Sequence, residues 1–329
     1  MSNYVLPNLK WITDVRATLV ERIVLSLDHL IFEANPKQYR GALDRETLQR
    51  TLVGPGDFPS ASIFAANSAL IEAALSNAAS QFDDRLEQLE RISATTGGAP
   101  QSLNVIAFSD IALDPDELVL LQRAYADDVG LTVSLVAPSE EEVSQATAQI
   151  QDALDLIGSS SMPWKQEILA LAPQIYLASP SAVATRTFGG AAVFDAFGSV
   201  LMNPDQFEST EQIALSLVHE TSHLQMFLFH LDDPVVLNDE KAAYSSPLRQ
   251  QPRPMEGIFH AMWVSARMVA AGIDILDGNS SKLDREKLQS IIDDSANAYR
   301  DCAVTVSKEG KLSLLGEELF ASADSIVNG

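Results

Sequence analysis

The pentapeptide His219-Glu220-Thr221-Ser222-His223 matches the pattern HExxH and lies inside an apolar-periodic run from 213 to 231. Residues four apart lie one above the other on one face of a helix, so the run predicts a helix that presents both imidazoles side by side. Two imidazoles placed in this way can hold one divalent metal ion, with Glu220 beside them. Because buried imidazoles require a partner, the run predicts a metal centre on a core helix.

Two histidines do not complete a metal site, because catalytic sites ordinarily have three protein ligands and one open position. The chain has only five histidines, and four of them fall within a short stretch: His219, His223, His230 and His260. The candidates for the third ligand are Asp239, Glu240, Glu256 and His260. For Asp239, a solvated acidic turn is the simpler interpretation.

The segment from 246 to 260 carries a second group of candidate residues. Pro254 can open a helix, and Glu256 and His260 would then be four apart on one face, so that either could reach the metal. Arg253 stands at the mouth of this helix, where its guanidinium offers a fork for a carboxylate. A surface arginine and a core histidine are the alternatives for Arg253 and His260.

Composition limits the partners that this chain can have. The 329 residues include 46% hydrophobic and 20% charged residues, which is enough for a sizeable core in one large domain or two. A formal net charge of -23 disfavours nucleic acid and anionic membranes, and it is compatible with a neutral or basic peptide. The single cysteine, Cys302, excludes an intrachain disulfide. With no signal-peptide pattern at Met1–Asp14 and no uncharged stretch of membrane-spanning length, we expect a cytoplasmic protein without a membrane partner.

Hydrophobic periodicity gives the expected elements. Helices are predicted over 10–34, 62–95, 109–128, 140–157 and 284–299, and strands over 131–137, 168–178 and 191–202. Loops are predicted over 53–60 and 95–102, and a serine linker over 159–161. Gly189-Gly190 marks either a turn or a close approach of the backbone to another group. Two strands before an HExxH helix is the order of zincin-like folds, where a sheet edge beside the metal can hold an extended peptide. We therefore predict an α+β protein with a mostly helical N-terminal region over 1–100. A zincin-like catalytic region with a small sheet would follow over 101–329, and the two regions could also form one continuous domain.

The motif residues together resemble a known family, the HExxH-type α-ketoglutarate-dependent peptide β-hydroxylases of ribosomal peptide natural-product (RiPP) biosynthesis. The matching positions are His219, Glu220, His223, Pro247, Arg249, Arg253, Pro254, Gly257 and His260. The resemblance covers about residues 170 to 270. The chain departs from the family at Leu248, where family members carry an aromatic residue.

The resemblance implies a dioxygenase that uses Fe(II), α-ketoglutarate and O₂ to hydroxylate the β-carbon of a residue in a peptide or ribosomal precursor peptide. His219, His223 and His260 would be the metal ligands, which departs from the usual facial triad with one carboxylate and leaves Glu256 as an alternative. Arg253, or else Arg249, would bind the distal carboxylate of α-ketoglutarate. Glu220 would orient a ligand or bind water.

Two other functions remain open from the sequence. In a zinc metallopeptidase, Glu220 would be the general base and Glu240 or Glu256 the third ligand. An oxygenase needs Arg253 and His260, whereas a peptidase needs neither. The other function is a non-catalytic peptide-binding module with a relic metal site. The sequence leaves open the peptide, any leader-binding partner and the oligomeric state.

Overall fold

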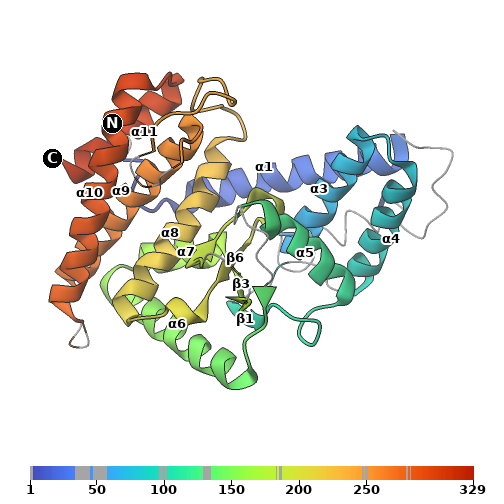
Figure 1. The fold of residues 1–329 in the computed structure, drawn as a ribbon, viewed down its shortest axis with the longest axis horizontal. Helices are drawn as coiled ribbons and strands as arrows, with labels where there is room; N and C mark the ends of the chain where they lie inside the picture. Colours follow the sequence, from blue (N-terminus) through green and yellow to red (C-terminus); the bar gives the residue numbers. More distant parts are fainter. Residues whose placement is uncertain are drawn as a thin grey trace. The chain divides into compact units, whose positions relative to one another are not determined.

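The computed structural model describes residues 3–33, 45–46, 58–95, 99, 102–128, 135–182, 184, 187–246, 248, 251–278, 281 and 283–329. These residues form a mostly helical protein with a small mixed sheet, which is compatible with the expected α+β class (Figure 1). Several sequence predictions fall wholly or partly outside the described residues. They are residue 34 of the first predicted helix, residues 53–57 of the loop at 53–60, residues 96–98, 100 and 101 of the loop at 95–102, residues 131–134 of a predicted strand, and the motif positions Pro247 and Arg249.

The chain divides into two compact units, and each is built from segments that are discontinuous in sequence. The unit that we call the histidine unit comprises residues 1–10, 147–168 and 207–329, and the sheet unit comprises 11–146 and 169–206. The predicted division into regions 1–100 and 101–329 stays a prediction.

The sheet unit contains a four-stranded sheet in the order β1-β3-β6-β5. Its strands are β1 (Asn104–Ala107), β3 (Gln174–Leu177), β5 (Gly190–Ala191) and β6 (Ser199–Met202). The pairs β1–β3 and β3–β6 are parallel, with Gln174 opposite Ser199, and β5 is antiparallel to β6. Every residue of β3 and β6 is buried, as expected for central parallel strands. A separate antiparallel pair joins β2 (Leu135–Val136) to β4 (Ser179–Pro180).

Both long strand predictions are partly wrong. Over 168–178, helix α7 (Met162–Leu171) continues into the predicted strand, and β3 begins only at Gln174. Over 191–202, the chain forms β5, then the short 3₁₀ helix η2 (Phe194–Ala196), and then β6. Gly198, with φ +90°, reverses the chain between η2 and β6 in a conformation that favours glycine. A second 3₁₀ turn, η3 (Pro204–Gln206), follows β6. Short apolar runs do not separate helix from strand by period alone, which explains these errors.

The helix predictions are closer to the structure. The helices before residue 175 are α1 (Leu9–Asp28), continued by the π-helical turn η1 (His29–Glu33), then α3 (Ala61–Leu75), α4 (Ala79–Thr95), α5 (Pro115–Asp128), α6 (Glu140–Ser160) and α7. The helix predicted over 62–95 divides at Asn77, whose φ of 53° ends α3. The predicted serine linker is wrong for Ser159 and Ser160, because both belong to α6.

The histidine unit is centred on α9 (Met255–Asp277), which packs against α8 (Thr210–Phe229), α10 (Arg285–Glu309) and α11 (Leu314–Val327). Gly272 allows a close approach of α10, since a Cβ there would lie 2.4 Å from Cγ1 of Ile292. Between α8 and α9, the indole N–H of Trp263 donates to Oε1 of Gln225 at 3.1 Å in the interior. These contacts fix the faces that α8 and α9 present to each other.

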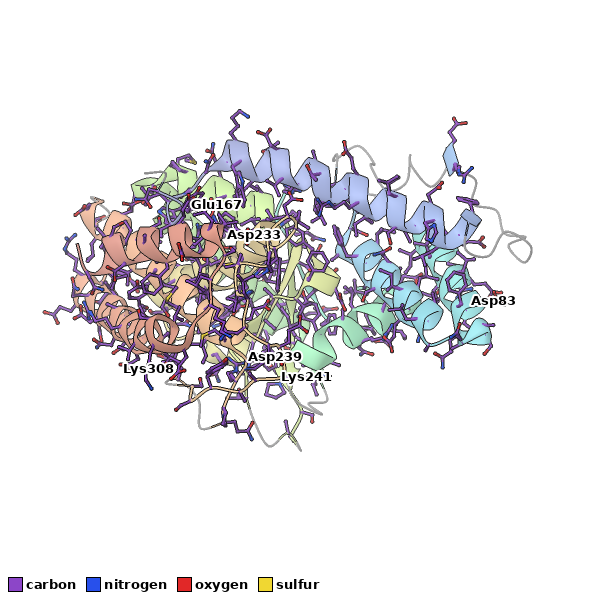
Figure 2. All side chains as sticks on the ribbon, turned by 90° about the horizontal axis from the view of Figure 1, so that it is seen from above. Asp83, Glu167, Asp233, Asp239, Lys241 and Lys308 are labelled. Carbon is purple, nitrogen blue, oxygen red and sulfur yellow. The ribbon has the colours of Figure 1, made fainter. Side chains whose placement is uncertain are left out.

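Arg267 connects α9 to two distant parts of the histidine unit. Its guanidinium donates to Oγ of Ser222 at 2.8 Å and to the carbonyl of Val5 at 2.9 Å, and it forms an ion pair with Glu167 of α7. Figure 2 shows Glu167 beside the helices of this unit. The Arg267 guanidinium also lies 4.7 Å from the ring centre of Trp164. Segments from 1–10 and 147–168 are therefore tied to the helix that carries His260.

Among the described helices, α9 alone has the length and composition of a membrane span, with a mean hydropathy of 1.2. In this structure 72% of its most apolar window is buried inside the protein. A buried core helix passes the same test, so the apolar character of α9 is explained by its central position.

Candidate metal centre

Helix α8 carries the HExxH pentapeptide, and the helix predicted over 213–231 is confirmed. Ser209 caps its N-terminus by accepting a hydrogen bond from the N–H of Gln212 at 3.2 Å. The Nε2 atoms of His219 and His223 lie 3.3 Å apart. Two nitrogen ligands of a tetrahedral ion, each about 2.0–2.1 Å from the metal, lie about 3.3–3.4 Å from each other. The spacing of this pair therefore fits a shared metal ion.

Helix α9 places His260 next to this pair. Pro254 precedes the first residue of α9, as the sequence predicts, and His260 lies one turn into the helix. Its Nδ1 lies 3.3 Å from Nδ1 of His223, and the two rings stack with centroids 5.6 Å apart. His260 is 9% exposed. The structure thus brings together the three histidines that the sequence selects.

The three rings lie in a row and do not surround one point. His223 faces His219 through Nε2 and faces His260 through Nδ1. Because one ion takes one nitrogen from each imidazole, binding a single ion by all three requires a change in a histidine side-chain torsion. The described geometry supports the His219–His223 pair directly and leaves the third ligand open.

The row continues to His230, which the sequence does not select as a ligand. His230 is the C-cap residue of α8, and its ring stacks on that of His260 with centroids 5.6 Å apart. Positions 219, 223 and 230 are four and seven apart, which places them on one helix face. This spacing is the sequence signal that could have included His230.

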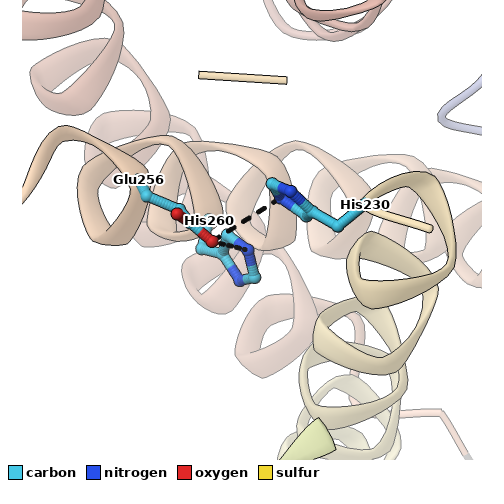
Figure 3. Close-up of side chains that lie close together, drawn as sticks. All are labelled: His230, Glu256 and His260. Atoms are coloured by element: carbon cyan, nitrogen blue, oxygen red, sulfur yellow. Dashed lines mark ion pairs between the residues drawn. The ribbon is translucent and has the colours of Figure 1, made fainter. Parts of the chain in front are cut away.

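Glu256 lies one turn before His260 on α9, and His230 lies across from both of them (Figure 3). Its Oε1 is 3.7 Å from Nε2 of His230 and 3.8 Å from Nε2 of His260. These three residues can place one ligand atom each within 4.8 Å of one another, and they are the only such His, Cys, Asp or Glu group among the described residues. The sequence names Glu256 as an alternative third ligand. In the structure it lies at the end of the row formed by His260 and His230, and not at the His219–His223 pair.

Burial keeps the histidines of the row neutral. It lowers the pKa of His219 to about 4. The pKa of His260 falls to about 3, first because of burial and then because of His230 and the charge of Arg253. The pKa of His223 is held well below its usual value by burial, then by His219, His260 and Arg253. Neutral imidazoles have a free lone pair at neutral pH, which is the form that binds a metal.

Arg253 lies at the entrance to α9, as expected from the sequence. It forms an isolated antiparallel bridge with Tyr244, with backbone hydrogen bonds of 2.8 and 2.9 Å. A Cβ built on Gly257 would lie 4.0 Å from Nε of Arg253, so the side chain runs along the first turn of the helix. Its influence on the pKa of His223 and of His260 shows that its charge reaches the row.

The remaining candidates differ in position. Glu220 lies on α8 next to His219 and is 6% exposed. Asp239 and Glu240 lie after α8, and both are exposed. Neither belongs to the group of converging ligand atoms among the residues that the structure describes. Arg249, the alternative for binding the keto acid, lies outside those residues.

A comparison of the sequence with protein-family models finds no match, and neither does a comparison with curated proteins.

Proposed function

We propose that this protein is an Fe(II)- and α-ketoglutarate-dependent oxygenase that hydroxylates the β-carbon of a residue in a peptide or ribosomal precursor peptide. The observation that carries the proposal is the His219–His223 pair, whose Nε2 atoms lie 3.3 Å apart on a buried helix with Arg253 close by. Along the chain, β5 and β6 precede the HExxH helix, which is the order of elements in zincin-like folds.

Each residue has a role in this proposal that follows from its surroundings. His219 and His223 offer Nε2 to the metal. The sulfur of Met268 lies 3.4 Å from Nδ1 of His219, where it can accept the ring hydrogen of the tautomer that has Nε2 free for the metal. His260 is the proposed third ligand, with Glu256 as the alternative. When bound, iron and α-ketoglutarate supply the oxidant that inserts one atom of O₂ into a C–H bond.

Arg253 distinguishes an oxygenase from a peptidase at this site. A guanidinium can bind the distal carboxylate of α-ketoglutarate through two parallel hydrogen bonds. A metallopeptidase needs no such cation, because its reaction consumes only water and peptide. The charge of Arg253 beside the histidine row therefore favours the oxygenase.

The first test needs no knowledge of the peptide. Protein loaded anaerobically with Fe(II) should give a visible charge-transfer band on addition of α-ketoglutarate, and should produce succinate when O₂ is admitted. The variant His219→Gln, which lacks a proposed ligand of the catalytic iron, should lose succinate formation, whereas Glu286→Gln, which changes an exposed acid on α10, should keep it. Absence of the band from the iron-loaded wild type would reject the oxygenase.

The second test uses candidate peptides and mass spectrometry. A product heavier by one oxygen atom, formed only with Fe(II), α-ketoglutarate and O₂, is the expected result. Cleavage of the peptide without the keto acid would instead identify a metallopeptidase.

A further inference from the structure

We propose that His230, Glu256 and His260 form a second site for a divalent transition-metal ion, which competes with the His219–His223 site because His260 can bind only one ion at a time. This inference rests on the geometry of these three residues and does not require the oxygenase activity. It concerns the C-terminal end of α8 and the first turns of α9.

The distances between the ligand atoms point to an ion between them. Oε1 of Glu256 is 3.7 and 3.8 Å from the two imidazole Nε2 atoms, which is too long for direct hydrogen bonds. Two ligands that share an ion of the usual bond length are about 3.0–3.4 Å apart, so a contraction of a few tenths of an ångström suffices. Figure 3 shows both rings facing the carboxylate.

The two imidazole nitrogens lack another partner. Nε2 of His230 and Nε2 of His260 are both buried, and neither has a hydrogen-bond partner among the described residues. Buried polar atoms in proteins are almost always satisfied, so two unsatisfied nitrogens beside one carboxylate require an explanation. A cation bound by all three groups satisfies them together.

The donor set defines the class of ion. Two imidazoles and one carboxylate match the facial triad of non-haem Fe(II) sites and also suit Zn²⁺ and Co²⁺. The side chain of Glu256 is 49% exposed, so solvent or a small ligand can reach the remaining coordination positions. The C-terminal end of α8 favours a cation at this place, whereas the nearby Arg253 opposes it.

His260 has a possible hydrogen-bond acceptor, Nδ1 of His223, for the ring N–H that would not face the metal. A histidine that binds a metal through one nitrogen commonly donates its other N–H to an acceptor. With Nε2 of His260 on the metal, its Nδ1–H can donate to Nδ1 of His223 at 3.3 Å. His223 then carries its hydrogen on Nε2, which points toward Nε2 of His219.

The two metal sites therefore affect each other through the His223–His260 contact. A metal on Nε2 of His223 leaves a hydrogen on its Nδ1, which then faces the Nδ1–H of a ligating His260. Because two hydrogens in this contact repel each other, we expect an ion at one site to weaken binding at the other. The second site is best measured with the first disabled.

The test measures the binding of Co²⁺ alone to the His219→Gln variant, by calorimetry and by visible absorption. This variant should bind one Co²⁺ per chain. Adding Glu256→Gln should weaken binding by at least about tenfold, since even residues that only orient a ligand affect affinity by 10–100-fold. Adding Glu286→Gln instead, an equal change in an exposed acid, should leave the affinity unchanged.

The variant His219→Gln with His230→Gln provides an independent check, because it removes a different ligand. Circular dichroism shows whether each variant is folded. If His219→Gln binds no Co²⁺, or binds it equally well with and without Glu256 and His230, the second site does not exist. Failure of the oxygenase proposal would give a different result. The wild-type protein would bind metal at His230, Glu256 and His260, but its Fe(II) form would show no charge-transfer band with α-ketoglutarate.

Discussion

Arg267 of α9 and Glu167 of α7 form an ion pair in which both side chains are 1% exposed. Arg267 lies on the helix that carries His260, two turns beyond it. Burial lowers the pKa of Arg267, and the carboxylate of Glu167 opposes this effect. The helix that contributes His260 to the histidine row is therefore held in place by a buried charge pair.

Breaking this pair should destabilise the protein strongly. Glu167→Gln leaves the buried guanidinium without its counter-charge, which typically costs about 3–5 kcal/mol in the free energy of unfolding. Urea denaturation monitored by circular dichroism measures the change. Glu286→Gln is the control and should alter stability by less than about 0.5 kcal/mol. A loss below about 1 kcal/mol for Glu167→Gln would mean that water or another group compensates the arginine.

Glu220 separates the two enzyme classes. In an oxygenase the oxidant comes from O₂ and the keto acid, so Glu220→Gln should reduce turnover only in part, through the orientation of its neighbours. In a metallopeptidase the same change removes the base that activates water and should abolish turnover while the metal stays bound. Succinate formation, peptide mass and metal content, measured on one preparation, distinguish these results.

Arg253 should control keto-acid affinity. A charge-assisted bond of about 1.5–3 kcal/mol is lost in Arg253→Ala, so the dissociation constant for α-ketoglutarate should rise about ten- to a hundred-fold. Arg253→Lys should recover little, because the two-pronged geometry is lost. The anaerobic charge-transfer band, titrated with α-ketoglutarate, gives the constant. Unchanged affinity in Arg253→Ala together with loss in Arg249→Ala would transfer the role to Arg249.

The stability of the metal-free protein should depend on pH through the histidine row. His219 has a pKa of about 4 when folded and 6.5 in its usual environment, so the unfolded chain binds more protons between these values. The stabilising contribution of the neutral ring is thus complete above pH 6.5 and falls as the pH decreases toward 4. Thermal unfolding in chelator across this range measures the slope. The variant His219→Gln should show a smaller slope, and an equal slope would exclude His219 as a source.

The parts of the site that depend on local sequence can be predicted. The pattern of apolar residues around the pentapeptide gives helix α8, and Pro254 gives the beginning of α9, because both signals act within a few residues. The position of Arg253 at the helix entrance follows from the same proline. The sequence also leads us to expect that His223 and His260 lie close together, because both are selected as ligands of one ion.

The arrangement of the row cannot be predicted in the same way. The approach of His230 to Glu256 depends on how α8 packs on α9, and this packing is set by distant contacts such as Trp263 with Gln225. The burial of Arg267 depends on Glu167 and Val5, which no local pattern connects to it. The strand predicted over 168–178 is wrong in its first part, because the apolar residues at the end of the buried helix α7 resemble those of a buried strand.

The contacts of Arg267 also set an order of events during synthesis. Val5 precedes Arg267 by 262 residues and Glu167 precedes it by 100, so both leave the ribosome well before their common partner. Contacts of such long sequence separation form slowly, and the nascent chain must keep these early segments available until α9 emerges. The interior around Arg267 can therefore form only after α9 has been synthesised, when residues 1–10 have already been outside the ribosome for most of translation. A truncation that removes residues 1–10 should slow or prevent the folding of this interior.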